Sequence, residues 1–238
     1  MKTLGLYWGY LIGEEHITEE QFAQIDFGNP NFDTEFILFD PLASSYFQGK
    51  YFRLSEKKFY FPHRTLPSMK AENMIVYEET NIKIIDPPVD LEAPVGIFLC
   101  FFIGKSSLVK KAIEFLGSKI NIRFSPCDLD LEKFYTKLSK TRFEIIPKSI
   151  TIGDIPIDEF SAGNLEVLVS DDQHFKRNMK TYKPKVQKIK LQLKEVNFQF
   201  EIEASINSSI NIDKEIENLN LLETLYDVAS RSVYSGIE

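Results

Sequence analysis

The sequence predicts a mixed α+β protein, with a β-rich N-terminal domain at residues 1–86 and an α/β domain at residues 95–238. The first domain holds short runs of β-branched and aromatic residues between turn signals. A proline-rich stretch at 87–94 is interpreted as the linker, because proline cannot donate to a strand ladder. A continuous apolar run then leads into a helical pattern. The α/β domain is expected to contain two strand–helix–strand units and a long C-terminal helix.

The N-terminal domain is expected to consist mainly of strands. Alternating apolar residues predict strands at 2–12, 34–39, 74–78 and 81–85. The aromatic-rich stretch 46–61 is predicted to hold two or three short strands, with turns at 48–49 and 55–57. A weak capping box at 18–21 favours a short helix that ends near Gly28.

The α/β domain is expected to begin with a strand at 95–104. This run is apolar at nearly every position, which is typical of a strand buried on both faces. Ser106 or Ser107 is expected to cap a helix that stops at Gly117. A strand at 119–124 completes the first strand–helix–strand unit.

A second helix and a second unit follow. Asp128 is expected to cap a helix that runs to Lys140. Residues 149–157 are predicted to form a hairpin that turns at 153–154, where the sequence reads Gly-Asp. The second strand–helix–strand unit is predicted from three segments, which are a strand at 165–169, a helix at 171–183 and a strand from 185.

The next hairpin has a register that its apolar and charged residues define together. The cross-strand pairs expected in that register are Leu193–Phe198, Leu191–Phe200, Ile189–Ile202, Lys190–Glu201 and Lys188–Glu203. This register leaves a four-residue loop at 194–197.

A long helix capped by Asp213 is expected to end the chain. Its apolar residues cover about half of its circumference, more than the ~100° stripe that is typical of a surface helix. Such a helix lies either in a deep groove of its own fold or against another chain. It is therefore the candidate element for a protein partner or for self-association. The candidate docking residues are Leu221, Leu225, Tyr226 and Val228.

Charge and cysteine content limit the classes of function. The net charge of the 238 residues is −7, yet residues 101–150 carry 10 basic and 5 acidic side chains. The two cysteines make no disulfide framework, which favours a reducing, cytoplasmic location. No stretch approaches the ~20 apolar residues of a transmembrane helix, and no secretory signal is evident, so no membrane association is expected.

Several catalytic chemistries are excluded by spacing. Gly104-Lys105-Ser106 follows a strand, but a phosphate-binding loop needs a glycine where Leu99 stands. No G-x-G-x-x-G motif is present, so no dinucleotide site is expected. The three histidines are far apart and outside any zinc-ligand pattern. No cofactor, metal site or catalytic residue is therefore predicted.

One enzymatic alternative stays open, a Mg²⁺-dependent nuclease or phosphodiesterase that uses carboxylates of the C-terminal domain. The candidate carboxylates are Asp128, Asp130, Glu132, Asp154, Asp158, Glu159, Asp171 and Asp172. Most of them also suit first helical turns or a tight turn, where acidic residues have a structural role.

Two groups of residues are candidates for contact with nucleic acid. The stretch 175–194 contains eight basic residues and no acid, and its helical part could bind phosphates. Its candidate residues are Lys176, Arg177, Lys180 and Lys183. In the N-terminal domain, aromatic rings beside cations are typical of surfaces that bind single-stranded nucleic acid. The candidates there are Tyr51, Arg53, Lys58 and Tyr60, which are expected on one outer face.

The paired strand–helix–strand units are similar to those of RNA-processing proteins with two ferredoxin-like domains. Those proteins carry a glycine-rich loop near the C-terminus, which this chain lacks, and we do not assign the chain to that family. We expect a non-catalytic interaction or assembly subunit of a cytoplasmic complex, with the basic middle as the candidate contact for nucleic acid.

Overall fold

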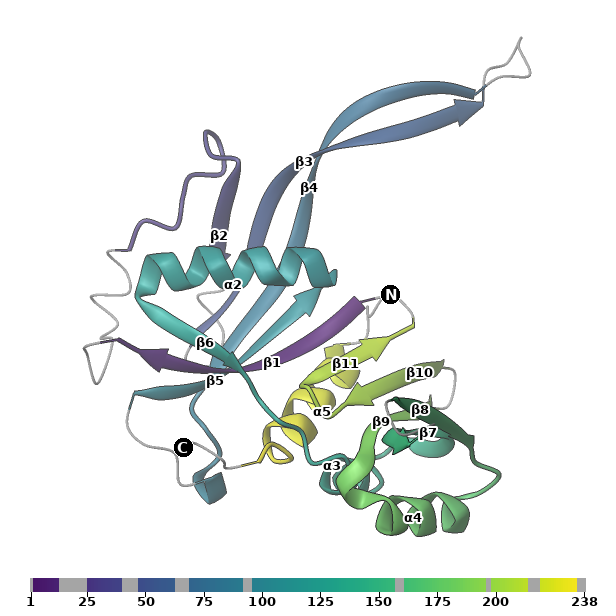
Figure 1. Ribbon diagram of the computed structural model, residues 1–238. Helices are drawn as coiled ribbons and strands as arrows, with labels where there is room; N and C mark the ends of the chain where they lie inside the picture. Colours follow the sequence, from purple (N-terminus) through teal and green to yellow (C-terminus); the bar gives the residue numbers. More distant parts are fainter. Residues whose placement is uncertain are drawn as a thin grey trace.

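The computed structural model describes residues 2–12, 25–39, 47–62, 69–91, 96–156, 161–195, 198–213 and 219–234. Its main element is an eleven-stranded antiparallel sheet (Figure 1). The strands are β1 (Lys2–Leu11), β2 (Glu35–Phe39), β3 (Phe47–Pro62), β4 (Met69–Ile85), β5 (Ile97–Gly104), β6 (Ile122–Pro126), β7 (Glu144–Pro156), β8 (Ala162–Leu168), β9 (Val186–Glu195), β10 (Phe198–Ser205) and β11 (Ser209–Ile212). The described helices are α2 (Ser106–Ile120), α3 (Leu131–Leu138), α4 (Asp172–Thr181) and α5 (Leu219–Ser230), with 3-10 turns η1 (Val89–Leu91) and η2 (Lys183–Lys185).

Strand β1 lies in the middle of the sheet and pairs with three other strands. The strand order is β2-β3-β4-β5-β1-β11-β10-β9-β7-β8, and β6 also pairs with β1. One edge of β1 pairs with β5, while the other edge pairs first with β11 and then with β6. The change occurs at Leu6, whose N–H donates to the Ser208 carbonyl and whose C=O accepts from Cys127 N–H. Strand β1 therefore joins the part of the sheet that contains β2 to β5 to the part that contains β7 to β11.

The two faces of β5 contribute to two hydrophobic cores. Strand β5 is buried along nearly its whole length, as its apolar sequence predicts. The larger core lies under α3, α4 and α5 and includes Trp8, Leu99, Phe101, Phe134, Phe175 and Leu225. The smaller core lies under α2 and includes Tyr51, Cys100, Phe102, Ala112 and Leu116.

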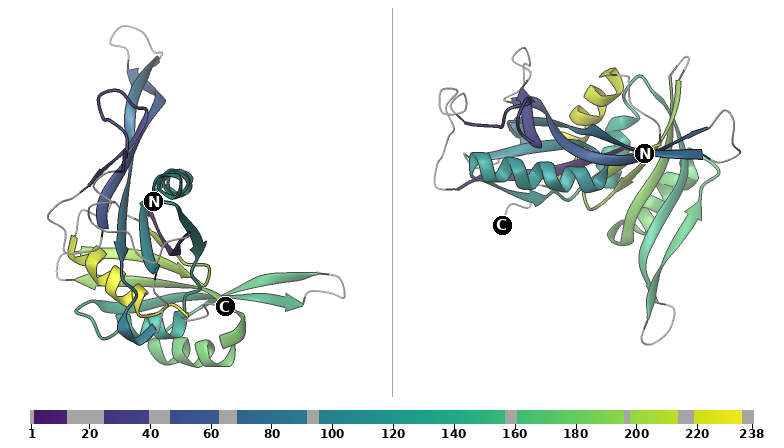
Figure 2. Two further views of the ribbon diagram at one scale, coloured as in Figure 1. Left: turned by 90° about the vertical axis from the view of Figure 1, so that its left-hand side faces the viewer. Right: turned by 90° about the horizontal axis from the view of Figure 1, so that it is seen from above.

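Two hairpins project from the body of the protein (Figure 2). Strands β3 and β4 pair along their whole lengths. Strand β2 pairs with β3 only along 49–53, and β5 pairs with β4 only along 81–85. The rest of β3–β4 is therefore a two-stranded ribbon. The second projecting hairpin is β7–β8, at the far end of the sheet.

The predicted fold class is wrong, because the protein is a mostly antiparallel sheet with short helices rather than a balanced α+β protein. The predicted strand–helix–strand segments exist, but β1 lies between β5 and β6, and β7 lies between β8 and β9. The described C-terminal helix has 12 residues and is shorter than α2, which has 15. Order along the chain predicts elements but not which strands become neighbours.

Three local predictions fail at helix ends. Helix α2 begins after Lys105 without a side-chain cap, so neither Ser106 nor Ser107 caps it. It continues past Gly117 and ends at Ile120. The next residue, Asn121, has a φ of 50°, the left-handed conformation common at helix C-termini. In α3 the cap is Asp130, whose carboxylate accepts from Lys133 N–H at 2.9 Å, rather than Asp128.

Three predicted turns lie inside strands. The stretch expected to hold two or three strands is the single strand β3, because cross-strand pairing with β4 continues through 48–49 and 55–57. Gly153 and Asp154 form a bulge within β7 instead of a hairpin turn, with Asp154 at a φ of 53°. The Gln187 side chain fills the space where a Cβ of residue 153 would lie.

The β9–β10 register differs from the predicted register by two residues. Phe198 is opposite Glu195, and Phe200 is opposite Leu193, so the loop is shorter than expected. Because side chains alternate with a period of two, the shift leaves every residue on its predicted face. The ion pairs Lys188–Glu203 (3.0 Å) and Lys190–Glu201 (3.1 Å) form diagonally.

Two further predictions stay open. The helix expected from 18–21 lies largely outside the described residues. The division into domains at 87–94 also stays a prediction, although β4 and β5 on either side of it pair within one sheet.

Candidate nucleic-acid interface

Helix α4 presents its lysines to solvent because its apolar residues are buried. The Asp171 carboxylate accepts from His174 N–H at 2.7 Å and so caps the first turn. Phe175 and Met179, one turn apart, enter the larger core. Lys176 and Lys180 are also one turn apart and are exposed. The sequence pattern therefore fixes which face of α4 is cationic.

Helix α3 packs beside α4 through an aromatic contact and a hydrogen bond. The Tyr135 and Phe175 rings lie 4.5 Å apart between centroids. The Tyr135 hydroxyl donates to the Asp172 carboxylate. Burial, together with this carboxylate, raises the pKa of Tyr135 above its usual range. Lys176, which lies 2.7 Å from Asp172, and then the Tyr135 hydroxyl lower the pKa of Asp172.

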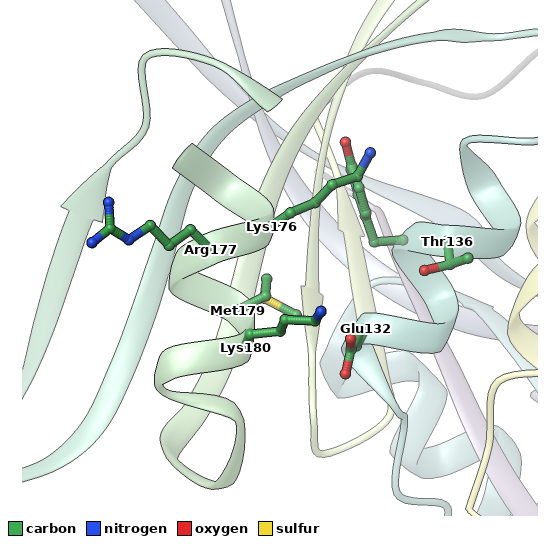
Figure 3. Close-up of a pocket in the computed structure, with 7 residues that line it drawn as sticks. Glu132, Thr136, Lys176, Arg177, Met179 and Lys180 are labelled. Atoms are coloured by element: carbon green, nitrogen blue, oxygen red, sulfur yellow. The ribbon is translucent and has the colours of Figure 1, made fainter. Parts of the chain in front are cut away.

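A groove of about 450 Å³ lies between the two helices (Figure 3). Its lining residues are Glu132, Tyr135 and Thr136 from α3, and Lys176, Arg177, Met179 and Lys180 from α4. The view shows Lys176 and Lys180 directed toward α3, whereas Arg177 points away from α3. The lining thus contains three cationic side chains and one carboxylate.

Some of the charged side chains in this region form ion pairs, and others do not. Lys176 is paired with Asp172, and Lys183 lies 2.7 Å from Glu132, a contact that raises the pKa of Lys183. Within the described part of the chain, neither Arg177 nor Lys180 forms an ion pair. These two exposed cations are therefore available to an anionic ligand.

The structure brings together only part of the predicted basic set. Lys176 and Lys180 share the groove, Arg177 stands on its outer side, and Lys183 lies beyond it against Glu132. Glu132 and Thr136 of α3 were not predicted as partners of these cations. Their four-residue spacing places them on one helix face, but which helix that face meets depends on the fold.

The N-terminal candidates do not form one face. Tyr51 is fully buried and contacts the Phe115 ring of α2. Arg53 is paired with Glu35 at 3.0 Å. Because β3 is one continuous strand, Lys58 points to the opposite face from Tyr51 and Arg53. The side chain of Tyr60 lies outside the described residues. The predicted outer face of alternating aromatics and cations is therefore wrong.

The residues predicted for partner docking lie inside the protein. Leu221, Leu225, Tyr226 and Val228 are all buried in the larger core. The Tyr226 ring lies 4.9 Å from the Phe101 ring, and Lys83 Nζ lies 4.7 Å above it. Of the two alternatives for this helix, the groove of its own fold is the one observed. A partner cannot reach these side chains in the folded protein.

The candidate carboxylates are dispersed. Asp130 and Asp171 cap helices, Asp172 contacts Tyr135 and Lys176, and Asp154 lies in the β7 bulge. Asp158 and Glu159 lie outside the described residues. Among the residues that the structure describes, no three His, Cys, Asp or Glu side chains gather as they would around a metal ion.

Comparisons with known proteins assign no family to this chain. No protein-family model matches it, and no curated protein matches it at a significant level. Within the described ranges, each helix is too short or too polar to cross a lipid bilayer.

Proposed function

We propose that the chain is a non-catalytic binding subunit that contacts the phosphate backbone of nucleic acid in the groove between α3 and α4. The observation that supports this proposal is the lining of that groove, which contains Lys176, Arg177 and Lys180 and one carboxylate, Glu132, that is itself paired with Lys183. Such a local cationic surface is notable in a chain whose net charge is −7.

The proposed contact is independent of base sequence. Lysine ammonium groups contact phosphate oxygens, and such contacts do not distinguish one base from another. Lys176 and Lys180 lie one turn apart, about 6 Å along the axis of α4. Each phosphate that they neutralise releases counterions, so binding weakens as salt rises. The proposal therefore predicts a measurable salt dependence.

Fluorescence anisotropy with single-stranded RNA and DNA of mixed sequence tests the proposal. The double variant K176Q/K180Q should bind more weakly than the native chain. Its slope of log K against log salt should fall by about 1.4, or about 0.7 for each lost contact. The matched control K110Q/K111Q removes two exposed lysines of α2 and should bind like the native chain. Equal binding by the native chain and the groove variant would overturn the proposal.

The same incubation tests the nuclease alternative, which no observation favours. With Mg²⁺ present, the oligonucleotides should stay intact under the non-catalytic proposal. Metal-dependent cleavage that is lost in Asp171→Ala or Asp128→Ala would overturn the non-catalytic proposal in favour of a nuclease.

A cytoplasmic location is part of the proposal and rests on two thiols, Cys100 and Cys127, that are both free and buried.

A further inference from the structure

The two edge strands of the sheet differ in whether other parts of the protein cover them. Strand β2 forms one edge and is only five residues long. The segment before it lies along its outer side, where Ile37 N–H donates to the Phe27 carbonyl at 3.0 Å. The Phe27 ring is buried against Phe39, 4.5 Å away between centroids. This edge is therefore covered by the protein itself, which prevents strand addition there.

Strand β8 forms the other edge and is open. Among the described residues, no backbone hydrogen bond covers its outer side. Five of its seven residues are exposed, including Leu165 at 49% and Leu168 at 78%. Every second residue of an edge strand directs an unpaired N–H and C=O outward. The strand therefore offers both backbone groups and apolar side chains to an added strand.

Strand β8 also lacks the residues that usually protect an open edge. It contains no lysine, arginine or proline. Its one charged residue is Glu166, whose carboxylate accepts a hydrogen bond of 2.6 Å from Ser149 Oγ in the neighbouring strand β7. The bulge at Gly153 and Asp154 lies in β7 and not on the outer side of β8. Nothing described in β8 opposes strand addition.

We propose that β8 pairs antiparallel with β8 of a second copy, which makes a two-fold symmetric dimer with one continuous sheet. Only the register with Leu165 on the two-fold axis pairs all seven residues of both strands. It sets Glu166 opposite Asn164 and Val167 opposite Gly163, so no like charges meet. A shift of two residues one way sets Glu166 against itself, and a shift the other way leaves Val167 and Leu168 unpaired.

The expected dimer is weak and strengthens with salt. A single pair of seven-residue strands is smaller than a standard interface, which buries ~1,600 Å². Each copy carries a net charge of −7, and added salt screens the repulsion between copies. This salt dependence is opposite in sign to that of the phosphate contact proposed above. The dimer does not depend on that function, and failure of either proposal leaves the other standing.

Sedimentation equilibrium of the full chain, at low and at moderate salt, tests the dimer. The native chain should pass from monomer to dimer as its concentration rises. Leu165→Lys places two cations at the axis and should leave a folded monomer. Leu38→Lys is the matched control, because Leu38 is 45% exposed but lies in the covered edge strand β2. It should dimerise like the native chain, and circular dichroism checks that both variants are folded.

Three outcomes would overturn the proposal. The native chain could stay monomeric at every concentration and salt. The Leu165→Lys variant could dimerise as the native chain does. Species larger than a dimer that Leu38→Lys also abolishes would indicate a head-to-tail contact between the two different edges.

Discussion

Among single residues, Glu78 has the clearest electrostatic role. Its carboxylate lies 2.7 Å from Lys57 Nζ and 2.9 Å from Lys105 Nζ, at the base of the β3–β4 hairpin. These two contacts, Lys57 first, lower the pKa of Glu78 from 4.5 to about 2. A carboxyl group with a lowered pKa stabilises the folded state fully above its unfolded pKa. That stabilisation is lost as the pH falls toward 2.

Glu78→Gln should therefore destabilise the protein in a pH-dependent way. At pH 7 the free energy of unfolding should fall by about 1–3 kcal/mol, since each pKa unit corresponds to about 1.4 kcal/mol and the group is partly solvated. The difference from the native chain should shrink between pH 4.5 and 2. Urea denaturation at a series of pH values measures it.

The adjacent ion pair provides the control for this measurement. Glu79 is about half exposed and lies 3.3 Å from Lys50. Exposed pairs of this kind contribute roughly 0–1 kcal/mol, so Glu79→Gln should have little effect at any pH. A loss in Glu78→Gln that is the same at pH 2.5 and pH 7 would show that packing, and not charge, is responsible.

At the scale of elements, α3 tests where a helix begins. Asp128 and Asp130 both precede the helix, and the sequence predicts Asp128 as its cap. In the structure Asp130 accepts from Lys133 N–H, while Asp128 is exposed. We expect Asp130→Ala to lower the free energy of unfolding by about 1 kcal/mol. Asp128→Ala should change it by less than about 0.5 kcal/mol, as surface substitutions usually do.

Urea denaturation of the two variants under one condition compares them directly. An equal loss in both would mean that the first turn does not depend on the Asp130 carboxylate. A larger loss in Asp128→Ala would place the cap at Asp128, as the sequence predicts.

At the scale of the whole molecule, the shared strands β1 and β5 link the two cores. Trp8 is the single tryptophan and lies in the larger core, while Leu116 lies in the smaller core under α2. Both side chains are almost fully buried. A sheet that is continuous through β1 and β5 should unfold in one cooperative transition.

Leu116→Ala should therefore shift the unfolding of both cores together. The loss expected for a buried leucine is about 2–5 kcal/mol. Trp8 fluorescence and far-ultraviolet circular dichroism should report the same lowered midpoint. A Trp8 transition that stays at its native midpoint while part of the dichroism moves would instead show that the two cores unfold separately.

The sequence predicts several features of this protein correctly, and each has a local cause. The apolar run at 95–104 predicts the doubly buried strand β5, and the 3.6-residue period of α4 predicts which of its lysines are exposed. In β9–β10 the alternation predicts the faces and even the ion pairs, although the register is shifted by two residues. Hydrophobic period and charge are properties of one short segment, so they can be read from the sequence alone.

The candidate groove is only half predictable from sequence. The cations of α4 follow from its helical period, but their neighbours Glu132 and Thr136 belong to a helix about 40 residues earlier in the chain. Tyr51 and Arg53 show the opposite case, because alternation gives their common face but not the helix α2 that covers it. A local pattern cannot say which distant segment will pack on a given face.

The periodicity of short segments is enough to predict the type and the buried face of most elements. Contacts between distant segments place β1 between β5 and β6, pair β3 and β4 in one long ribbon, and bury the apolar face of α5. The same contacts cover β2 and leave β8 open. The physical reason is that periodicity arises within a few residues, whereas strand order and burial arise from contacts between segments far apart in the chain.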